Sequence, residues 1–200
     1  MKTRRGRPRL YDPDEALTAA GGIFWAQGFD GTSLDDLSEA MGMNRPSIYR
    51  AFGDKEAVYR KSLARFCEKM DAGASATLFA DSDIRRGLRK FLLEAIEIYT
   101  TTPHPLGCMV MCTAPAAAVS HPDVRADLLS VIKSLDERIE ARLQIAVEAE
   151  QLPKSIDPKT LSHLIQSVLH SLAIRSRAGQ SKAVLRKLVD GAVGTFFPTP

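Results

Sequence analysis

The sequence predicts an all-α fold. Apolar residues recur at helical spacing along almost all of the 200 residues, and no segment shows the strict apolar–polar alternation that is typical of a β-strand. Prolines and glycines separate the periodic segments, as helix breakers do. With 44% hydrophobic residues the chain can bury a packed core, so we expect a globular helical protein.

The first helix is expected to begin after Asp12 and to end at Gly28. The Asp12 side chain can accept hydrogen bonds from the free amide groups of the first turn. Pro13 suits the first position of a helix, and Glu15 can complete a capping box.

Two short helices are expected next. Thr32 is expected to cap the first of them, which Gly42 ends, and Asn44 is expected to cap the second, which runs through Phe52. Only a short turn separates the two helices.

The rest of the chain predicts six further helices. The fourth helix is expected to run from Lys55 to about Phe79, with fraying at Gly73. The others are expected at about residues 84–101, 108–118, 122–150, 157–178 and 181–196, separated by Pro103, Pro105, Pro122, Pro153, Pro158 and Gly179. We therefore expect two domains, one over residues 1–60 and a larger one over residues 61–200.

Charge is distributed unevenly, although the formal net charge is only +3. A small net charge excludes a general nucleic-acid coat, so the position of the basic residues matters more than their sum. A cluster of them precedes the first acidic residue, Asp12, and consists of Lys2, Arg4, Arg5, Arg7 and Arg9. Such an arm either reaches into a DNA groove beside a reading helix or is a solvated tail.

Cysteine usage predicts a reducing compartment. Cys67, Cys108 and Cys112 cannot all pair within the chain, and no apolar signal-peptide segment follows the basic start. The apolar runs at residues 109–118 and 161–173 are too short or too interrupted by polar residues to span a bilayer. We therefore expect a cytoplasmic protein with no membrane partner.

The two short helices have the pattern of a helix-turn-helix. Such a motif needs a small residue where the helices cross, a glycine at the turn and apolar residues that lock the pair together. Ser38 and Gly42 meet the first two needs, and the apolar set is Leu37, Met41, Met43 and Ile48. A helical hairpin in an ordinary core has a similar pattern, so the turn alone does not decide the function.

The polar face of the second short helix favours DNA binding. Arg45, Ser47, Tyr49 and Arg50 make it more basic and aromatic than a core hairpin requires. Because the second helix of the motif enters the major groove, Arg45 and Ser47 are candidates for base reading, and Pro46 offers an apolar contact.

Other residues are better placed for DNA phosphates. Tyr49, Lys55 and Thr32, the last at a helix N-terminus, are candidates for backbone contacts. The full set of candidate DNA contacts is Arg4, Arg5, Arg7, Thr32, Ser33, Arg45, Pro46, Ser47, Tyr49, Arg50 and Lys55.

At these residues the chain resembles the tetracycline-repressor (TetR/AcrR) family of bacterial transcription factors. The segment at residues 28–33 is similar to the family's loop before its second helix, and residues 47–57 are similar to its tyrosine, Phe-Gly and Lys-Glu signature. The resemblance covers about residues 11–60. It implies that Thr32, Tyr49 and Lys55 contact the DNA backbone, while Pro46 stands where many relatives have a small residue.

The resemblance also implies an architecture. A three-helix DNA-binding head is expected to join, through a fourth linking helix, a regulatory body whose last two helices form a four-helix dimer interface. The implied function is a homodimeric repressor that binds operator DNA and is released by a small-molecule effector. Candidate interface residues are Leu161, Leu164, Ile165, Val168, Leu169, Leu172, Val184, Leu188 and Ala192.

The implied effector pocket lies in the regulatory body. Apolar and aromatic residues there would line it, with tyrosine or histidine supplying polar contacts. Candidate ligand contacts are Phe66, Phe91, Tyr99, His104, Met109 and His121.

Two alternatives to this function have a basis in the sequence. Cys108 and Cys112 share a helix face near His104, which suits either a thiol or metal sensor or simple packing. His163, Ser167 and His170 also share a face, but no orienting acid or oxyanion element accompanies them as hydrolysis would require. We therefore predict no enzyme activity, no cofactor and no metal site.

Overall fold

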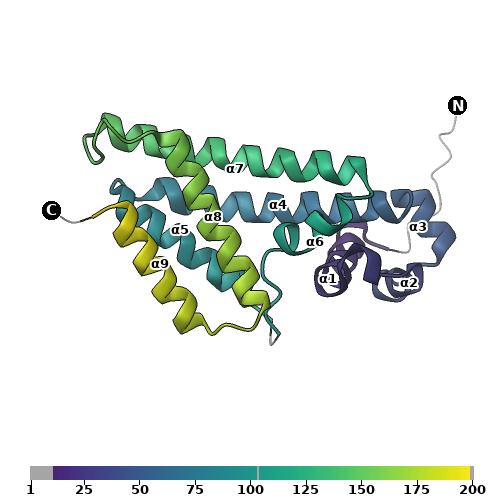
Figure 1. Ribbon diagram of the computed structural model, residues 1–200. Helices are drawn as coiled ribbons and strands as arrows, with labels where there is room; N and C mark the ends of the chain where they lie inside the picture. Colours follow the sequence, from purple (N-terminus) through teal and green to yellow (C-terminus); the bar gives the residue numbers. More distant parts are fainter. Residues whose placement is uncertain (1–10, 103, 199–200) are drawn as a thin grey trace, which may run out of the picture. The chain divides into compact units, whose positions relative to one another are not determined.

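The computed structural model describes residues 11–102 and 104–198, apart from the side chains at positions 72, 74 and 75. Within this part of the chain the regular structure consists of nine α-helices and includes no strand, as the sequence predicts (Figure 1). The chain divides into two compact units between Arg65 and Phe66, five residues after the expected boundary.

The first unit contains α1 (Pro13–Gly31), α2 (Leu34–Met41), α3 (Arg45–Phe52) and the beginning of α4 (Lys55–Ala80). α1 begins as predicted, because the Asp12 side chain accepts hydrogen bonds from the amides of Asp14 and Glu15. Gly28, the predicted end, is a kink with φ 76°, after which the chain stays helical to Gly31.

The cap of α2 differs from the prediction. Ser33, not Thr32, is the N-cap: its hydroxyl accepts from the Asp36 amide at 3.1 Å, and the Asp36 carboxylate accepts from the Ser33 amide at 2.7 Å. The Thr32 hydroxyl instead donates to the carbonyl oxygen of Gly28 at 2.7 Å. The kink at Gly28 leaves that oxygen outside the regular helical pattern, and Thr32 satisfies it.

An aromatic cluster holds the first unit together. The Tyr59 ring of α4 lies 4.9 Å from the Phe24 ring and 5.1 Å from the Phe29 ring, measured between centroids. Leu37 of α2 and Ile48 of α3 are fully buried. Burying apolar surface is favourable by about 25 cal/mol per Å². Such contacts are therefore the main force that holds α2 and α3 in this unit.

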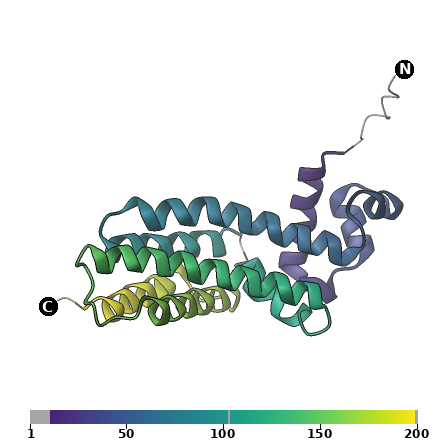
Figure 2. The same cartoon turned by 90° about the horizontal axis from the view of Figure 1, so that it is seen from above.

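The second unit contains the rest of α4 with α5 (Ile84–Tyr99), α6 (Met109–Ala117), α7 (Pro122–Glu148), α8 (Pro158–Arg177) and α9 (Lys182–Phe196). These helices agree with the predicted ranges to within a few residues, and α4 runs through Gly73 without interruption. α8 packs against α5, α7 and α9, and α4 runs beside α7 (Figures 1 and 2).

A buried arginine fastens the end of α4 to α7. The Arg142 guanidinium donates to the carbonyl oxygens of Leu78, Asp81 and Ser82 at 3.2, 3.0 and 3.0 Å, and its side chain is almost fully buried. It therefore satisfies carbonyl groups that the end of a helix leaves open.

In the described residues, none of the helices combines the length and the apolar character that crossing a bilayer requires.

Candidate functional site

The turn between α2 and α3 has the geometry that a helix-turn-helix needs. Gly42 adopts the left-handed conformation, with φ 61° and ψ 30°. The Met43 amide donates to the Ser38 carbonyl at 3.1 Å, and the Ser38 hydroxyl donates back to the Met43 carbonyl. Buried apolar side chains lock the helices together as predicted, namely Leu37, Met41, Met43 and Ile48.

The opposite face of α3 is open to solvent. Asn44 caps the helix as predicted, since its side chain accepts from the Ser47 amide at 2.9 Å. The helix exposes Arg45, Pro46 and Arg50, together with Tyr49, whose exposed fraction of 47% is high for an aromatic residue. A basic, aromatic face that is open to solvent is suited to contacting a nucleic acid.

Arg45, the predicted base reader, is held by an acidic residue of α2. Its Nε and Nη2 both donate to Oδ1 of Asp35, at 3.0 and 2.5 Å. The hydrogen bond to Asp35 raises the pKa of the Arg45 guanidinium, which is charged in any case. Sequence reasoning missed Asp35, although an acid in the first turn of α2 is visible in the sequence.

The residues predicted to contact DNA phosphates differ in their exposure to solvent and in their contacts within the protein. Ser33 is exposed at the start of α2, and the Lys55 ammonium lies 4.4 Å from the centroid of the Phe29 ring. Thr32 is 1% exposed and its hydroxyl donates to the Gly28 carbonyl oxygen, so the side chain is engaged within the unit, and its contact with DNA stays a prediction. The predicted contacts Arg4, Arg5 and Arg7 lie outside the described residues.

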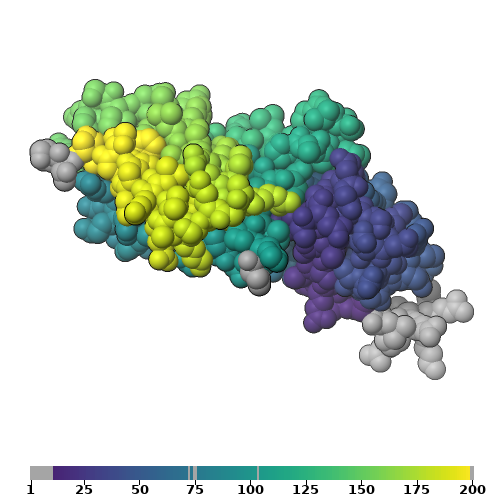
Figure 3. Space-filling view, turned by 60° about the horizontal axis from the view of Figure 1, so that its bottom comes forward, coloured from purple at the N-terminus to yellow at the C-terminus, as the bar shows by residue number. Residues whose placement is uncertain are grey.

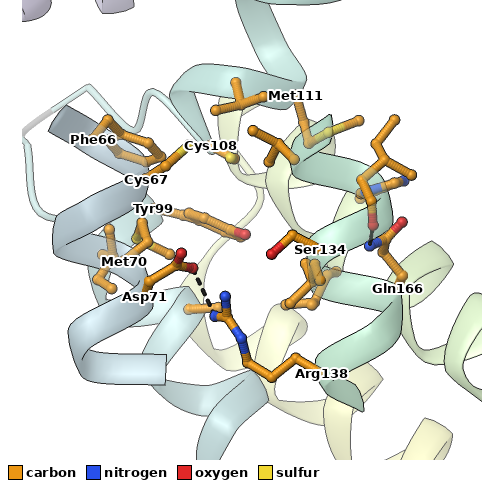
Figure 4. A pocket seen from close by; sticks show the side chains of 18 of the residues that line it. Phe66, Cys67, Met70, Asp71, Tyr99, Cys108, Met111, Ser134, Arg138 and Gln166 are labelled. Carbon is orange, nitrogen blue, oxygen red and sulfur yellow. Dashed lines mark hydrogen bonds and ion pairs between the residues drawn. The ribbon is translucent and has the colours of Figure 1, made fainter. Parts of the chain in front are cut away.

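A cavity of about 250 Å³ lies inside the second unit (Figure 4). It is lined by residues of α4, α5, α6, α7 and α8 and by Cys108, and three predicted ligand contacts are among them: Phe66, Phe91 and Tyr99. The other apolar lining includes Met70, Ala95, Ile98, Val110, Met111, Val131, Ile132, Leu135 and Leu169.

Three predicted ligand contacts do not line the cavity. His104 is exposed in the loop before α6, and His121 caps α7 outside the cavity. Met109 is buried in the core, while its neighbours Cys108 and Val110 supply the lining. α6 is apolar almost all round, so its pattern did not indicate which side faces the cavity.

The cavity contains charged groups that sequence reasoning missed. Arg138 of α7 donates through Nη1 to Oδ1 of Asp71 of α4 at 2.7 Å, and the two side chains point toward one another in Figure 4. These residues are 67 positions apart, so no local pattern indicates that they pair.

The cysteines lie in environments that disfavour a reactive thiolate. Burial raises the pKa of Cys108 to about 11 and that of Cys67 to about 12, and it also raises the pKa of Cys112. A sensor thiol needs the opposite shift. Over residues 11–102 and 104–198, no group of three or more His, Cys, Asp or Glu side chains could hold a metal ion.

The polar trio of α8 has no arrangement for hydrolysis. The Ser167 hydroxyl donates to the backbone oxygen of His163 at 2.8 Å, not to an imidazole nitrogen. His163 Nε2 lies 3.7 Å from Oδ2 of Asp136, and burial lowers the pKa of His170.

The residues predicted for a dimer interface divide into two groups. Leu161, Ile165, Leu169 and Leu172 are buried in the chain's own core. The exposed or half-buried ones are Leu164, Val168, Val184, Leu188 and Ala192. α8 and α9 lie side by side on one face of the second unit (Figure 3), so an interface there would rest on this second group.

Each of the two units matches a known protein-family model. The family model "Bacterial regulatory proteins, tetR family" matches residues 16–61, and "Tetracyclin repressor-like, C-terminal domain" matches residues 84–191. The transcriptional repressor ComR of Escherichia coli K12 is 28% identical over 98% of this chain and 92% of its own length. The transcriptional repressor AcnR of Corynebacterium glutamicum is 27% identical over 98% of this chain and 97% of its own length.

A solved structure agrees with the fold. A cysteine mutant of the TetR family transcriptional regulator CifR, in complex with a 26-bp double-stranded operator DNA, superposes with a TM-score of 0.86. Its sequence is 28% identical, and the match covers 94% of this chain and 98% of that one. With its helix-turn-helix in the first unit and both family models matched, this chain belongs to the tetracycline-repressor family of DNA-binding transcriptional regulators.

Proposed function

We propose that the protein is a homodimeric repressor whose affinity for operator DNA is controlled by a small molecule bound in the cavity of the second unit. One observation supports a coupling between the cavity and the DNA-binding unit. α4 supplies residues 55–65 to the helix-turn-helix unit, and further along it supplies Phe66, Cys67, Met70 and Asp71 to the cavity lining. A ligand that alters this helix therefore acts on an element shared with the DNA-binding unit.

The DNA-binding part of the proposal is supported by the exposed face of α3. Arg45 at the first turn can hydrogen-bond a guanine edge, and Tyr49 and Arg50 flank it on the same short helix. ComR and AcnR are both named repressors, which favours repression over activation.

The dimer is supported by apolar side chains that the chain leaves exposed. Leu164 of α8 and Val184 of α9 have exposed fractions of 50% and 48%. Burying such side chains against a second copy is favourable by about 25 cal/mol per Å². A two-fold dimer would present two α3 helices to two half-sites of one operator.

The experiment selects bound fragments from a random pool of duplex DNA and then screens small molecules for release of the selected duplex. An effector should weaken operator binding by about 5- to 150-fold, and saturating operator must weaken effector binding by the same factor. Effector affinity that is equal with and without operator would contradict the proposal and leave a constitutive DNA binder that contains a cavity.

A cavity-filling variant locates the effector site. Ala95 lines the cavity and is buried, so Ala95→Phe should remove the effector response while DNA binding persists. Ala116→Phe, the same change at an exposed position of α6, is the matched control. An unchanged response in Ala95→Phe would place the effector elsewhere.

A further inference from the structure

The cavity has an apolar wall with one ion pair set into it. Phe66, Met70, Phe91 and Leu135 are among the apolar lining residues, whereas Asp71 and Arg138 form the ion pair between α4 and α7 (Figure 4). Its volume of about 250 Å³ lies below the roughly 300–1,000 Å³ of sites for drug-sized ligands. A suitable ligand is therefore small and largely apolar, with one polar end.

The two partners of the ion pair are not equivalent. The Arg138 side chain is 18% exposed, whereas the Asp71 side chain is 53% exposed. A guanidinium carries five N–H donors, and Asp71 accepts from Nη1. The less exposed partner is thus the one that can donate further hydrogen bonds.

This asymmetry selects the charge of the ligand. A cationic ligand that paired with Asp71 would leave a largely buried guanidinium without its carboxylate, which is costly. A carboxylate ligand would replace Asp71 at Arg138 with a group of the same kind, and the displaced Asp71 could be hydrated. The planar guanidinium also fits a carboxylate through two parallel hydrogen bonds.

We propose that the effector class is a small carboxylic acid with an apolar body, bound through its carboxylate to Arg138 in place of Asp71. The inference rests on the proposed effector-binding function. The ligand breaks the ion pair between α4 and α7, and this break transmits binding because α4 is shared with the helix-turn-helix unit. The Ser134 hydroxyl points into the same space and can donate to the ligand (Figure 4).

One feature of the lining favours the opposite charge. Glu94 of α5 is a second acid in the cavity wall, and its carboxylate accepts a hydrogen bond from the Thr77 hydroxyl of α4. An amine ligand would use Glu94 with Asp71. The experiment therefore compares an acid and an amine of equal chain length.

Calorimetry on the full chain, at neutral pH and fixed salt, measures the binding of octanoate, octylamine and octanol. Octanoate should bind most tightly. Arg138→Gln should weaken octanoate about tenfold or more and leave octanol unchanged, because only the acid uses the charged hydrogen bonds. The matched control is Arg89→Gln, which removes an arginine that pairs with Asp190 at the same 2.7 Å but does not line the cavity.

A second variant changes affinity in the opposite direction. Asp71→Asn removes the carboxylate that competes for Arg138, so octanoate should bind to this variant several-fold more tightly than to the native chain. This test does not depend on whether Arg138→Gln folds. The same variant should weaken binding to the selected DNA in the absence of ligand, because it breaks the α4–α7 ion pair as the ligand does.

Three results would overturn the inference: tighter binding of octylamine than octanoate, equal losses in Arg138→Gln and Arg89→Gln, or no binding of folded protein to any acid from hexanoate to dodecanoate. If another compound still releases the selected DNA, the proposed function stands and the carboxylate class alone fails. Failure of the protein to select any DNA would instead contradict the proposed function.

Discussion

Oδ1 of Asp35 accepts hydrogen bonds from both Nε and Nη2 of Arg45, which joins the first turn of α2 to the first turn of α3. Both side chains are more than half exposed. The pair therefore contributes little to stability, since solvent screens exposed ion pairs. Its consequence concerns DNA: an acid on the proposed binding face competes with the duplex for the arginine that we expect to read it.

The first prediction follows from that competition. Asp35→Asn should raise affinity for random-sequence duplex more than for the selected duplex, because it removes a negative charge near the phosphates and frees Arg45 for non-specific contacts. Fluorescence anisotropy at fixed salt with both duplexes measures the ratio. Glu39→Gln, the same charge change at an exposed position of α2, is the control. Unchanged affinity for the random duplex would refute a competing role of Asp35.

The second prediction concerns the backbone contacts. Tyr49→Ala and Lys55→Ala should weaken binding to all sequences alike, since phosphate contacts carry no sequence information. Tyr49→Phe, which keeps the ring, separates the contribution of the hydroxyl group. Titrations with the selected duplex and a scrambled duplex should show equal fold losses. A loss confined to the selected duplex would make Tyr49 a base reader instead.

The fold and the turn could be predicted because their signals are local. Asp12, Asn44 and Gly42 act on amides or dihedral angles within a few residues of themselves, and the structure confirms all three. Thr32 shows the limit of such reasoning. Thr32 and Ser33 each have an aspartate three residues later, so the capping-box pattern fits both residues and does not decide between them.

The cavity and the surface of α8 could be predicted only in part. Asp71 and Arg138 meet through packing of α4 and α7, far apart in sequence. α8 contacts four other helices of its own unit, α5, α6, α7 and α9, so its apolar residues point in several directions. Periodicity alone therefore could not separate Ile165, which is buried, from Leu164, which is exposed.

The third prediction tests the dimer. Leu164→Glu and Val184→Glu place charges on exposed apolar positions, so each chain should fold but sediment as a monomer, because an unpaired charge would be buried in the interface. Leu129→Glu, at a position of α7 with 65% exposure, is the control and should stay dimeric. If Leu164→Glu and Val184→Glu both remained dimers, the interface would lie elsewhere.

The fourth prediction follows from the raised cysteine pKa values. With a pKa of about 11 for Cys108 and about 12 for Cys67, both thiols are protonated at neutral pH, and the reactive thiolate forms only as the pH rises toward those values. Iodoacetamide should therefore label them slowly in the native protein and rapidly in denaturant. Rapid native labelling, together with a loss of DNA binding on mild oxidation that a reductant reverses, would support a thiol sensor.

The fifth prediction concerns the anchor of α4. Arg142→Leu leaves the carbonyl oxygens of Leu78, Asp81 and Ser82 without this donor, so the free energy of unfolding should fall by about 1–3 kcal/mol or more. Urea denaturation measures the change. Arg89→Leu, at an exposed arginine of α5, should change it by less than about 1 kcal/mol. Equal effects of the two changes would show that Arg142 is no anchor.

Selection from a random duplex pool, carried out in parallel with the native chain and with Arg45→Ala, tests the central claim that α3 reads operator DNA. The native chain should select two symmetric half-sites spaced about 34 Å or a multiple of it, as a dimer with two reading helices requires. Arg45→Ala should lose preference at one or two positions of each half-site, at a cost of about 1–3 kcal/mol in discrimination. An unchanged sequence preference in Arg45→Ala, or no enriched sequence for the native chain, would contradict the assignment of α3 as the reading helix.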